Sequence, residues 1–323
     1  MQNKWLITEE QADTRLDRFL TRHCAGLTNG MIQKAVRQKK ILLNGKKVAA
    51  NTRLMVRDLL VCLLETTPAP KKSFPVSEKD AQFIQNLVIY KDEDILILNK
   101  PAGLAVQGGS KTTRHIDGML DALKYEKAER PCLVHRLDKE TSGVLVLGRT
   151  KKATAMLTKG FASRQIHKIY WALVEGVPAY DKGRIDAPLL KKNTANQQEQ
   201  MVVDYERGQS ATSLYRVVDT AQKVSWLELM PLTGRTHQLR VHCALMQTPI
   251  VGDEKYNTEP KELSFTEKKM YLHAAGIKIP RIGKETLEIY AKMPHYMEDS
   301  FKFLGFHNNL KINAFDFFKE GIK

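Results

Sequence analysis

PCLVHRLDKETSGVLVL, residues 131–147, places a run of ionisable residues between two apolar segments. The apolar segments predict two strands, and the polar run predicts a loop at the edge of their sheet. A loop between two core strands is a rigid platform that can present a side chain to a substrate. Asp138 lies at the centre of this loop, beside Arg136 and Lys139, and an ionised, partly enclosed carboxylate can act as a nucleophile or a base. The charge pattern alone is also explained by a solvated turn with local ion pairs.

Residues 87–310 contain further short apolar segments bounded by turn residues. Four of them predict strands: Ile95–Leu98, Val144–Leu147, Ile169–Val174 and Trp226–Met230. Helical spacing predicts helices over residues 153–161 and 237–246, and the polar stretch 191–200 predicts a surface loop. Strands and helices do not alternate regularly, so we expect an α+β fold with a mixed, largely antiparallel sheet.

Residues 12–65 form a smaller basic unit. Apolar residues at spacings of three and four predict two helices, and Asn44-Gly45 between short apolar runs predicts a hairpin. Three prolines within residues 66–75 predict an extended, mobile connection. We therefore expect a small domain over residues 12–65, a linker over 66–86 and a larger domain over 87–310.

The charge balance indicates an anionic partner. The 323 residues include 51 Lys and Arg against 36 Asp and Glu, a net charge of +15. A field of this sign attracts polyphosphate chains, although a basic surface can also serve solubility. Nucleic acid is thus the partner that the composition favours.

The cysteines and the lengths of the apolar runs indicate where the protein is located and whether it binds a membrane or a metal. Four separated cysteines predict no disulfide framework and favour a reducing, cytoplasmic location. The longest apolar run, Leu59–Leu64, is far shorter than the ~20 residues that span a bilayer, so we expect no membrane partner. His135 has only Cys132 at ligand spacing, and two ligands do not make a site, so we expect no metal.

Two further segments carry candidate site residues. KIYWALVEG, residues 168–176, is apolar on both faces, so Tyr170 is either an ordinary core tyrosine or a functional one. PLTGRTHQLRVH, residues 231–242, predicts a turn and then a helix that Thr233 or Thr236 can cap. Arg235 then lies near the positive end of the helix, where a cation is disfavoured by ~0.3–1 kcal/mol unless an anion is nearby. That anion can be Asp138, an RNA phosphate or both; an accidental surface arginine is the plain alternative.

HRLDKETSG, residues 135–143, resembles the signature of the RluA family of pseudouridine synthases. The resemblance implies that Asp138 is the catalytic carboxylate and that Arg136 fills the space left when the target base flips out of its helix. The family patterns K-x-Y and T-G-R-x-H-Q-[LI]-R match residues 168–170 and 233–240. They imply that Tyr170 stacks on the extruded uracil and that Arg235 pairs with Asp138.

Two other resemblances imply RNA partners. Residues 12–65 resemble the S4 RNA-binding domain through RLD at residues 15–17 and LLNG at residues 42–45. This resemblance implies RNA contacts from the basic residues Arg15, Arg18, Lys34, Arg37, Lys39, Lys40 and Lys46. NKPAGLAVQGGS, residues 99–110, resembles the RluC branch, which implies action on 23S large-subunit ribosomal RNA.

These observations predict an RluC-like enzyme that isomerises specific uridines of 23S ribosomal RNA to pseudouridine. The reaction breaks the C1′–N1 bond and rejoins the uracil through C5 without redox change, so we expect no cofactor. Three alternatives stay open: a non-catalytic RNA-binding or ribosome-assembly factor, an enzyme acting on transfer RNA or another ribosomal target, and a glycosidase-like hydrolase. The hydrolase would need a second acid ~5–9.5 Å from the first, and no second candidate stands out.

Overall fold

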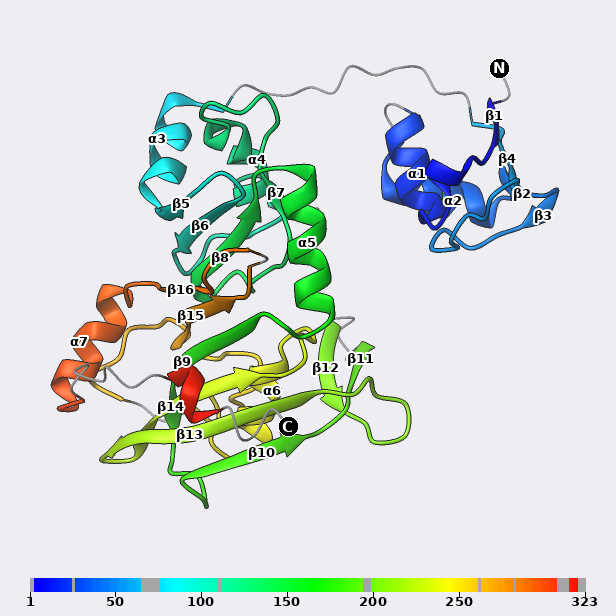
Figure 1. The fold of residues 1–323 in the computed structure, drawn as a ribbon. Helices are drawn as coiled ribbons and strands as arrows, with labels where there is room; N and C mark the ends of the chain where they lie inside the picture. Colours follow the sequence, from blue (N-terminus) through cyan, green and yellow to red (C-terminus); the bar gives the residue numbers. More distant parts are fainter. Residues whose placement is uncertain are drawn as a thin grey trace. The chain divides into compact units, whose positions relative to one another are not determined.

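The computed structural model describes residues 3–24, 27–64, 76–109, 112–193, 199–260, 263–281, 283–306 and 314–318. The chain divides into two compact units, residues 1–75 and 76–323 (Figure 1). Residues 66–75 of the predicted linker lie outside the described residues. Each unit has an apolar core of its own.

The first unit packs two helices against a four-stranded sheet. The elements are β1 (Asn3–Leu6), η1 (Glu9–Gln11), α1 (Leu16–His23), α2 (Asn29–Arg37), β2 (Ile41–Leu43), β3 (Lys46–Lys47) and β4 (Leu59–Cys62), with strand order β1-β4-β2-β3. The predicted hairpin is confirmed between β2 and β3. Asn44 and Gly45 have φ of 51° and 74°, as the two-residue turn that suits twisted strands requires.

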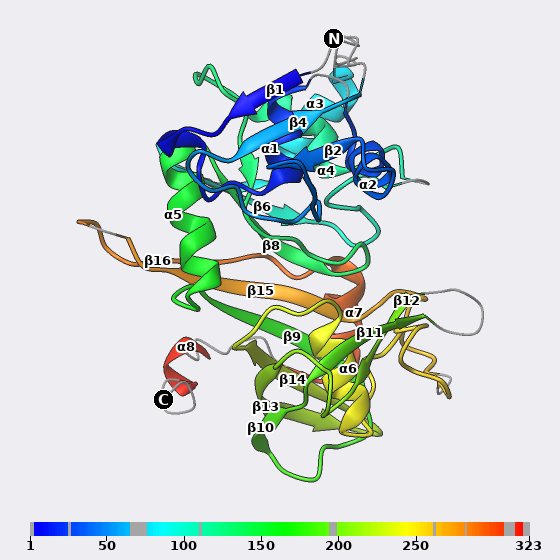
Figure 2. The same cartoon turned by 90° about the vertical axis from the view of Figure 1, so that its right-hand side faces the viewer.

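The second unit is built on a ten-stranded sheet (Figures 1 and 2). Its strands are β5 (Val88–Lys91), β6 (Ile95–Lys100), β7 (Cys132–Leu133), β8 (Ser142–Gly148), β9 (His167–Glu175), β10 (Lys182–Asp186), β13 (Thr212–Ala221), β14 (Val224–Pro231), β15 (Leu272–Ile279) and β16 (Leu287–Tyr290). The main order is β10-β13-β14-β9-β15-β8-β6-β5, and β15 with β8 is the parallel pair among the described strands. The predicted mixed, largely antiparallel α+β fold is confirmed, as are the four predicted strands.

Helices cover both faces of this sheet because both faces are apolar. The helices are α3 (Glu78–Asn86), α4 (Ile116–Met119) with η2 (Leu120–Leu123), α5 (Lys151–Ala162), α6 (Gln238–Leu245), α7 (His295–Phe303) and α8 (Ala314–Phe317). Figure 2 shows α5 and α8 on one side of the sheet and α6 on the other. Neighbouring strand residues point to opposite layers, so Ile169 packs with α8 while Tyr170 packs in the core that α6 shares.

The structure corrects three boundaries. Residues 78–86, expected to be linker, form α3, because Ser77 caps the helix at Asp80 and Ile84 is fully buried in the main core. The polar stretch 191–200 is not simply a loop, because β11 (Leu189–Asn193) and β12 (Glu199–Val203) pair within it; residues 194–198 lie outside the described residues. The larger unit also continues beyond residue 310, since α8 packs on its sheet.

Gly143 allows strands β8 and β15 to approach each other closely. It pairs with Ala274 of β15 and has φ of 107°, and a Cβ there would lie 2.2 Å from the carbonyl oxygen of Ala274. Only glycine permits this approach of β8 to β15. Because β15 also pairs with β9, the approach places the loop before β8 near Tyr170.

Candidate active site

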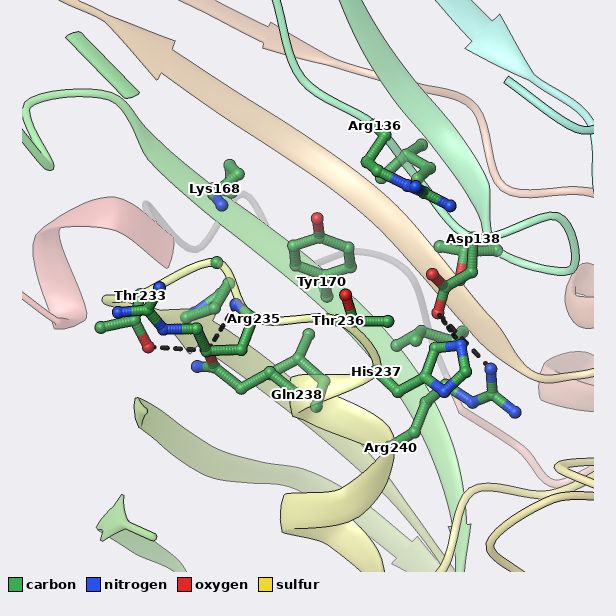
Figure 3. A pocket seen from close by; sticks show the side chains of 16 residues that line it. Arg136, Asp138, Lys168, Tyr170, Thr233, Arg235, Thr236, His237, Gln238 and Arg240 are labelled. Atoms are coloured by element: carbon green, nitrogen blue, oxygen red, sulfur yellow. Dashed lines mark hydrogen bonds and ion pairs between the residues drawn. The ribbon is translucent and has the colours of Figure 1, made fainter. Parts of the chain in front are cut away.

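A pocket of about 130 Å³ opens between the loop before β8, the strand β9 and the turn before α6 (Figure 3). Its walls combine apolar side chains (Leu137, Leu239, Leu272) with polar and charged ones. Asp138 is the one carboxylate among the described residues that line it. Of the predicted site residues, Arg136, Asp138, Tyr170 and Arg235 all line this pocket, although Arg235 does not pair with Asp138.

A buried lysine, Lys100, is hydrogen-bonded to the loop that carries Asp138. Lys100 Nζ donates hydrogen bonds to the carbonyl oxygens of Pro101, Leu104 and Lys139, at 2.9, 2.9 and 3.0 Å. Burial lowers the pKa of Lys100 to about 7, against the raising influence of Glu140 and Asp138. Anchoring the residue directly after Asp138 fixes the direction of its carboxylate, whose side chain is 21% exposed.

The guanidinium beside Asp138 belongs to Arg240. Arg240 Nη1 lies 3.5 Å from Asp138 Oδ2, while its Nε and Nη2 each donate at 2.7 Å to the buried carboxylate of Asp253. Its guanidinium also stacks on the ring of Tyr256, 5.0 Å from the centroid. Burial opposes the charge, but the hydrogen bonds to Asp253 and the charge of Asp138 leave the pKa of Arg240 above its ordinary value.

The predicted pairing of Arg235 with Asp138 is therefore wrong. Arg235 is exposed, and its Nε donates at 3.0 Å to the carbonyl oxygen of Ser210. The reason lies in where the helix begins: α6 starts at Gln238, so Arg235 stays in the preceding turn and Arg240 occupies the first helical turn. Neither predicted threonine caps the helix; the N-cap is His237, in the left-handed conformation with φ of 53°.

Gln238 holds this turn against the sheet. Its amide nitrogen donates to the Thr212 carbonyl and the Ser213 hydroxyl, and its Oε1 accepts from Thr233 Oγ1 and the Arg235 N–H. Gln238 is buried, so these hydrogen bonds are protected from water. The turn that forms one wall of the pocket is thereby rigid.

His237 joins Asp138 to a tyrosine that the sequence did not indicate. Its Nδ1 lies 2.8 Å from the hydroxyl of Tyr256, and its Nε2 lies 3.8 Å from Asp138 Oδ2. Burial lowers the pKa of His237, although the charge of Asp138 acts in the opposite sense. A neutral imidazole thus lies beside the carboxylate.

Tyr170 and Arg136 complete the pocket. Tyr170 is buried on β9, and its hydroxyl has no hydrogen-bond partner among the described residues; burial, and secondarily the charge of Asp138, raise its pKa. Its ring faces the cavity between Lys168 and Asp138 (Figure 3). Arg136 is exposed at the pocket and has no ion pair within the described part of the chain. Stacking by Tyr170 and helix filling by Arg136 stay predictions.

Sequence reasoning missed Lys168, His237, Arg240, Asp253 and Tyr256. A signal existed for Arg240, because an arginine within the mostly apolar run QLRVHCAL must find an acid when the helix packs on a sheet. Asp253 and Tyr256 had no such signal, since they follow α6 in irregular chain.

The predicted RNA-binding residues of the first unit lie on its surface. Arg15 is partly buried and pairs with Asp17 at 2.6 Å. Arg18, Lys34, Arg37, Lys39, Lys40 and Lys46 are all exposed. Their RNA contacts stay a prediction. Among the described residues no group of three or more His, Cys, Asp or Glu could hold a metal ion, and no described helix is long and apolar enough to cross a membrane.

Comparisons with known proteins find similar sequences along most of the chain. A family model described as RNA pseudouridylate synthase matches residues 94–245. The ribosomal large subunit pseudouridine synthase C of Rickettsia prowazekii is 36% identical over 294 residues, covering 87% of this chain and 94% of that protein. The protein of the same name from Vibrio cholerae is 30% identical, covering 91% and 94%. A solved structure, human RNA pseudouridylate synthase domain containing 4, has 30% identity and a TM-score of 0.60 over 70% of this chain and 95% of its own.

Proposed function

Because the chain belongs to the RNA pseudouridylate synthase family, we propose that it isomerises specific uridines of 23S ribosomal RNA to pseudouridine. The observation that carries this proposal is the placement of Asp138 as the one carboxylate among the described pocket residues, beside the guanidinium of Arg240 and across from Tyr170. The names of the relatives support large-subunit ribosomal RNA as the substrate.

The proposed reaction moves one proton and exchanges one bond. The C1′–N1 bond breaks, the uracil turns within the pocket, C1′ bonds to C5, and the hydrogen of C5 is replaced by one on N1. Asp138 is the group in the pocket that can act as a nucleophile, either at C6 of the ring or at the sugar. Arg240 holds the carboxylate, and Leu137, Leu239 and Leu272 give the detached uracil apolar walls. The isomerisation transfers no electrons and so calls for no redox cofactor.

The target base must first leave its stack, at a cost of a few kcal/mol. Stacking on an aromatic ring returns ~1–3 kcal/mol per base, and Tyr170 is the aromatic residue in the pocket wall. Arg136, exposed at the pocket, supplies a planar cation that can occupy the vacated position in the RNA.

The first unit is proposed to act as an S4-like RNA-binding module, supported by its exposed basic residues. We also propose a cytoplasmic location. The four cysteines support it because all of them are free, as expected of a reducing compartment.

The test compares three proteins on unmodified large-subunit ribosomal RNA: the wild type, Asp138→Asn and Glu140→Gln. Glu140 is the matched control, an acid two residues away that is paired with Lys139 at 3.7 Å and does not line the pocket. The wild type and Glu140→Gln are expected to form pseudouridine at the same sites, and Asp138→Asn to form none. The proposal fails if the wild type leaves every uridine unchanged or if Asp138→Asn keeps its rate.

A further inference from the structure

A second cavity, of about 650 Å³, adjoins the catalytic pocket. It runs between the loop before β8, the end of α5 with the start of β9, and the turn after β14. Six residues line both cavities, namely Arg136, Lys168, Pro231, Thr233, Gly234 and Arg235. The two cavities are thus continuous, and we name the second one the basic groove.

The described side chains that line the basic groove include four cations and no carboxylate. The four cations are Arg136, Arg164, Lys168 and Arg235. The same four cations form no ion pair with any described residue; Arg235 donates to the Ser210 carbonyl oxygen instead. His135 and His167 also line the groove, and burial lowers the pKa of each, so the positive charge comes from the arginines and the lysine. Like charges gathered around one cavity repel each other unless an anion joins them.

Lys168 lies where the catalytic pocket and the basic groove meet. It lies two residues before Tyr170 on β9, so both side chains point to the same face (Figure 3). Burial lowers its pKa to about 8, and within the described chain Nζ has no hydrogen-bond acceptor. Nζ lies 5.9 Å from the centroid of the Phe161 ring, and a Cβ built on Gly234 would lie 3.9 Å from Nζ. The Lys168 side chain is partly buried and lines both cavities, so an anionic oxygen in the groove would give its ammonium a charged hydrogen bond.

We propose that the basic groove binds backbone phosphates of the RNA next to the flipped uridine, through Arg164, Lys168 and Arg235. This inference rests on the proposed function. A uridine seated at Asp138 stays attached to its strand, so its neighbouring phosphates must leave the pocket along an open side. In Figure 3, Lys168 lies beyond Tyr170 from Asp138, where the pocket continues into the groove. Backbone phosphates contact protein mainly through arginine and lysine, and these contacts position the strand without reading its sequence.

Arg164 is the residue to test, because it is exposed, lines only the groove and has φ of 61° in the turn after α5. Arg164→Asn keeps a residue type that tolerates this backbone conformation. Lys152→Gln is the matched control: an exposed cation on α5, outside both cavities and without an ion pair among the described residues.

The experiment uses the full chain and an unmodified large-subunit ribosomal RNA fragment in which the wild type forms pseudouridine. We expect Arg164→Asn to raise the Kd about tenfold, as for loss of a charged hydrogen bond. The slope of log K against log salt is expected to fall by about 0.7–0.9, as for one phosphate contact, with kcat at saturating RNA unchanged. Lys152→Gln should change none of these values.

A neutral methylphosphonate placed at each phosphate beside the target uridine then locates the contact. One of these substitutions is expected to weaken binding of the wild type but not of Arg164→Asn. If Arg164→Asn keeps the wild-type Kd and salt slope while the wild type still forms pseudouridine, the groove does not bind the strand and the proposed function stands. If the wild type forms no pseudouridine in any RNA, the proposed function itself has failed.

Discussion

Arg240 Nη1 lies 3.5 Å from Asp138 Oδ2, at the end of a guanidinium whose other nitrogens are committed to Asp253 at 2.7 Å. One arginine thus serves two acids, and the buried one fixes its position. The contact to Asp138 is the longer, so the carboxylate keeps oxygen lone pairs free for the substrate. Asp138, Asp253 and Arg240 together carry a net negative charge. Because Asp253 fixes the guanidinium, Arg240 stays beside Asp138.

Arg240 and Arg235 should therefore differ sharply when neutralised. Arg240→Gln leaves Asp253 buried without a cation, with only the backbone N–H groups of Lys255 and Tyr256 donating to its carboxylate. This substitution is expected to cost ~3–5 kcal/mol of folding free energy. It also removes one preorganised charge from Asp138, and kcat should fall on the order of a hundredfold. Arg240→Lys keeps the positive charge but loses the planar guanidinium that donates to both oxygens of Asp253. Its folding stability and its kcat should therefore lie between those of the wild type and those of Arg240→Gln. Thermal unfolding and single-turnover pseudouridine formation measure the two effects separately.

Arg235→Gln is the control for this comparison. Its side chain is exposed and bonded to a carbonyl oxygen, so folding stability should change by less than ~0.5 kcal/mol. We expect a higher KM for RNA with kcat nearly unchanged. An equal loss of kcat in Arg235→Gln and Arg240→Gln would contradict the assignment of Arg240 as the partner of Asp138.

The sequence predicted the strands and the Asp138 loop because both depend on local patterns. Apolar runs bounded by turn residues became β6, β8, β9 and β14, and the polar run between β7 and β8 became the site loop. The partner of Asp138 could not be obtained this way. It depends on the residue at which α6 begins, because Arg240 lies in the first helical turn whereas Arg235 stays in the turn before it.

The helix α3 was wrongly predicted to be part of the linker. The prolines of residues 66–75 suggested a linker that continued to residue 86, although Ser77 followed by Glu78 and Asp80 is a helix-start pattern. The predicted end of the domain at residue 310 was wrong for a different reason. The segment after it is short, and its apolar side chains are buried only because a sheet face built from distant residues receives them.

Tyr170 offers a test that separates its ring from its hydroxyl. The hydroxyl has no hydrogen-bond partner within the described chain, whereas the ring lines the pocket. Tyr170→Phe should keep kcat within a few-fold of the wild type, and Tyr170→Leu should lose ~1–3 kcal/mol of stacking. Single-turnover rates with saturating RNA measure the difference. Equal losses in both variants would show that the hydroxyl itself takes part in the reaction.

The helix α8 stabilises the sheet behind the site. Phe315 and Phe318 pack with Ile169, Leu214 and Met230, directly behind the strand that carries Tyr170. Phe315→Ala is expected to lower the free energy of unfolding by ~3–5 kcal/mol. Phe317 is the control on the same helix: it is 39% exposed and contacts Arg216 at 4.3 Å through its ring, so Phe317→Ala should cost about 1 kcal/mol. Urea unfolding would contradict this packing role if the two variants were equally stable.

His237 should set the acidic limit of activity. Burial lowers its pKa, so the ring is neutral near pH 7 and becomes a cation only as the pH falls through that lowered value. A cationic ring 3.8 Å from Asp138 Oδ2 forms an ion pair that adds to the one from Arg240 and leaves the carboxylate less nucleophilic. Asp138, Arg240, Lys255 and Asp253 act electrostatically on His237, and the Tyr256 hydroxyl is hydrogen-bonded to its Nδ1.

Protonation of His237 is expected to lower kcat only at acidic pH. Because the pKa of His237 is lowered, kcat should hold steady down to below the ordinary range of histidine and then fall. His237→Asn suits the left-handed backbone at φ of 53° and removes the titrating ring, so its acidic limb should move to lower pH. Tyr256→Phe removes the hydrogen bond to Nδ1 but keeps the ring, so it should retain an acidic limb. Profiles of kcat at saturating RNA in which the wild type and His237→Asn share the same acidic limb would assign that limb to another group.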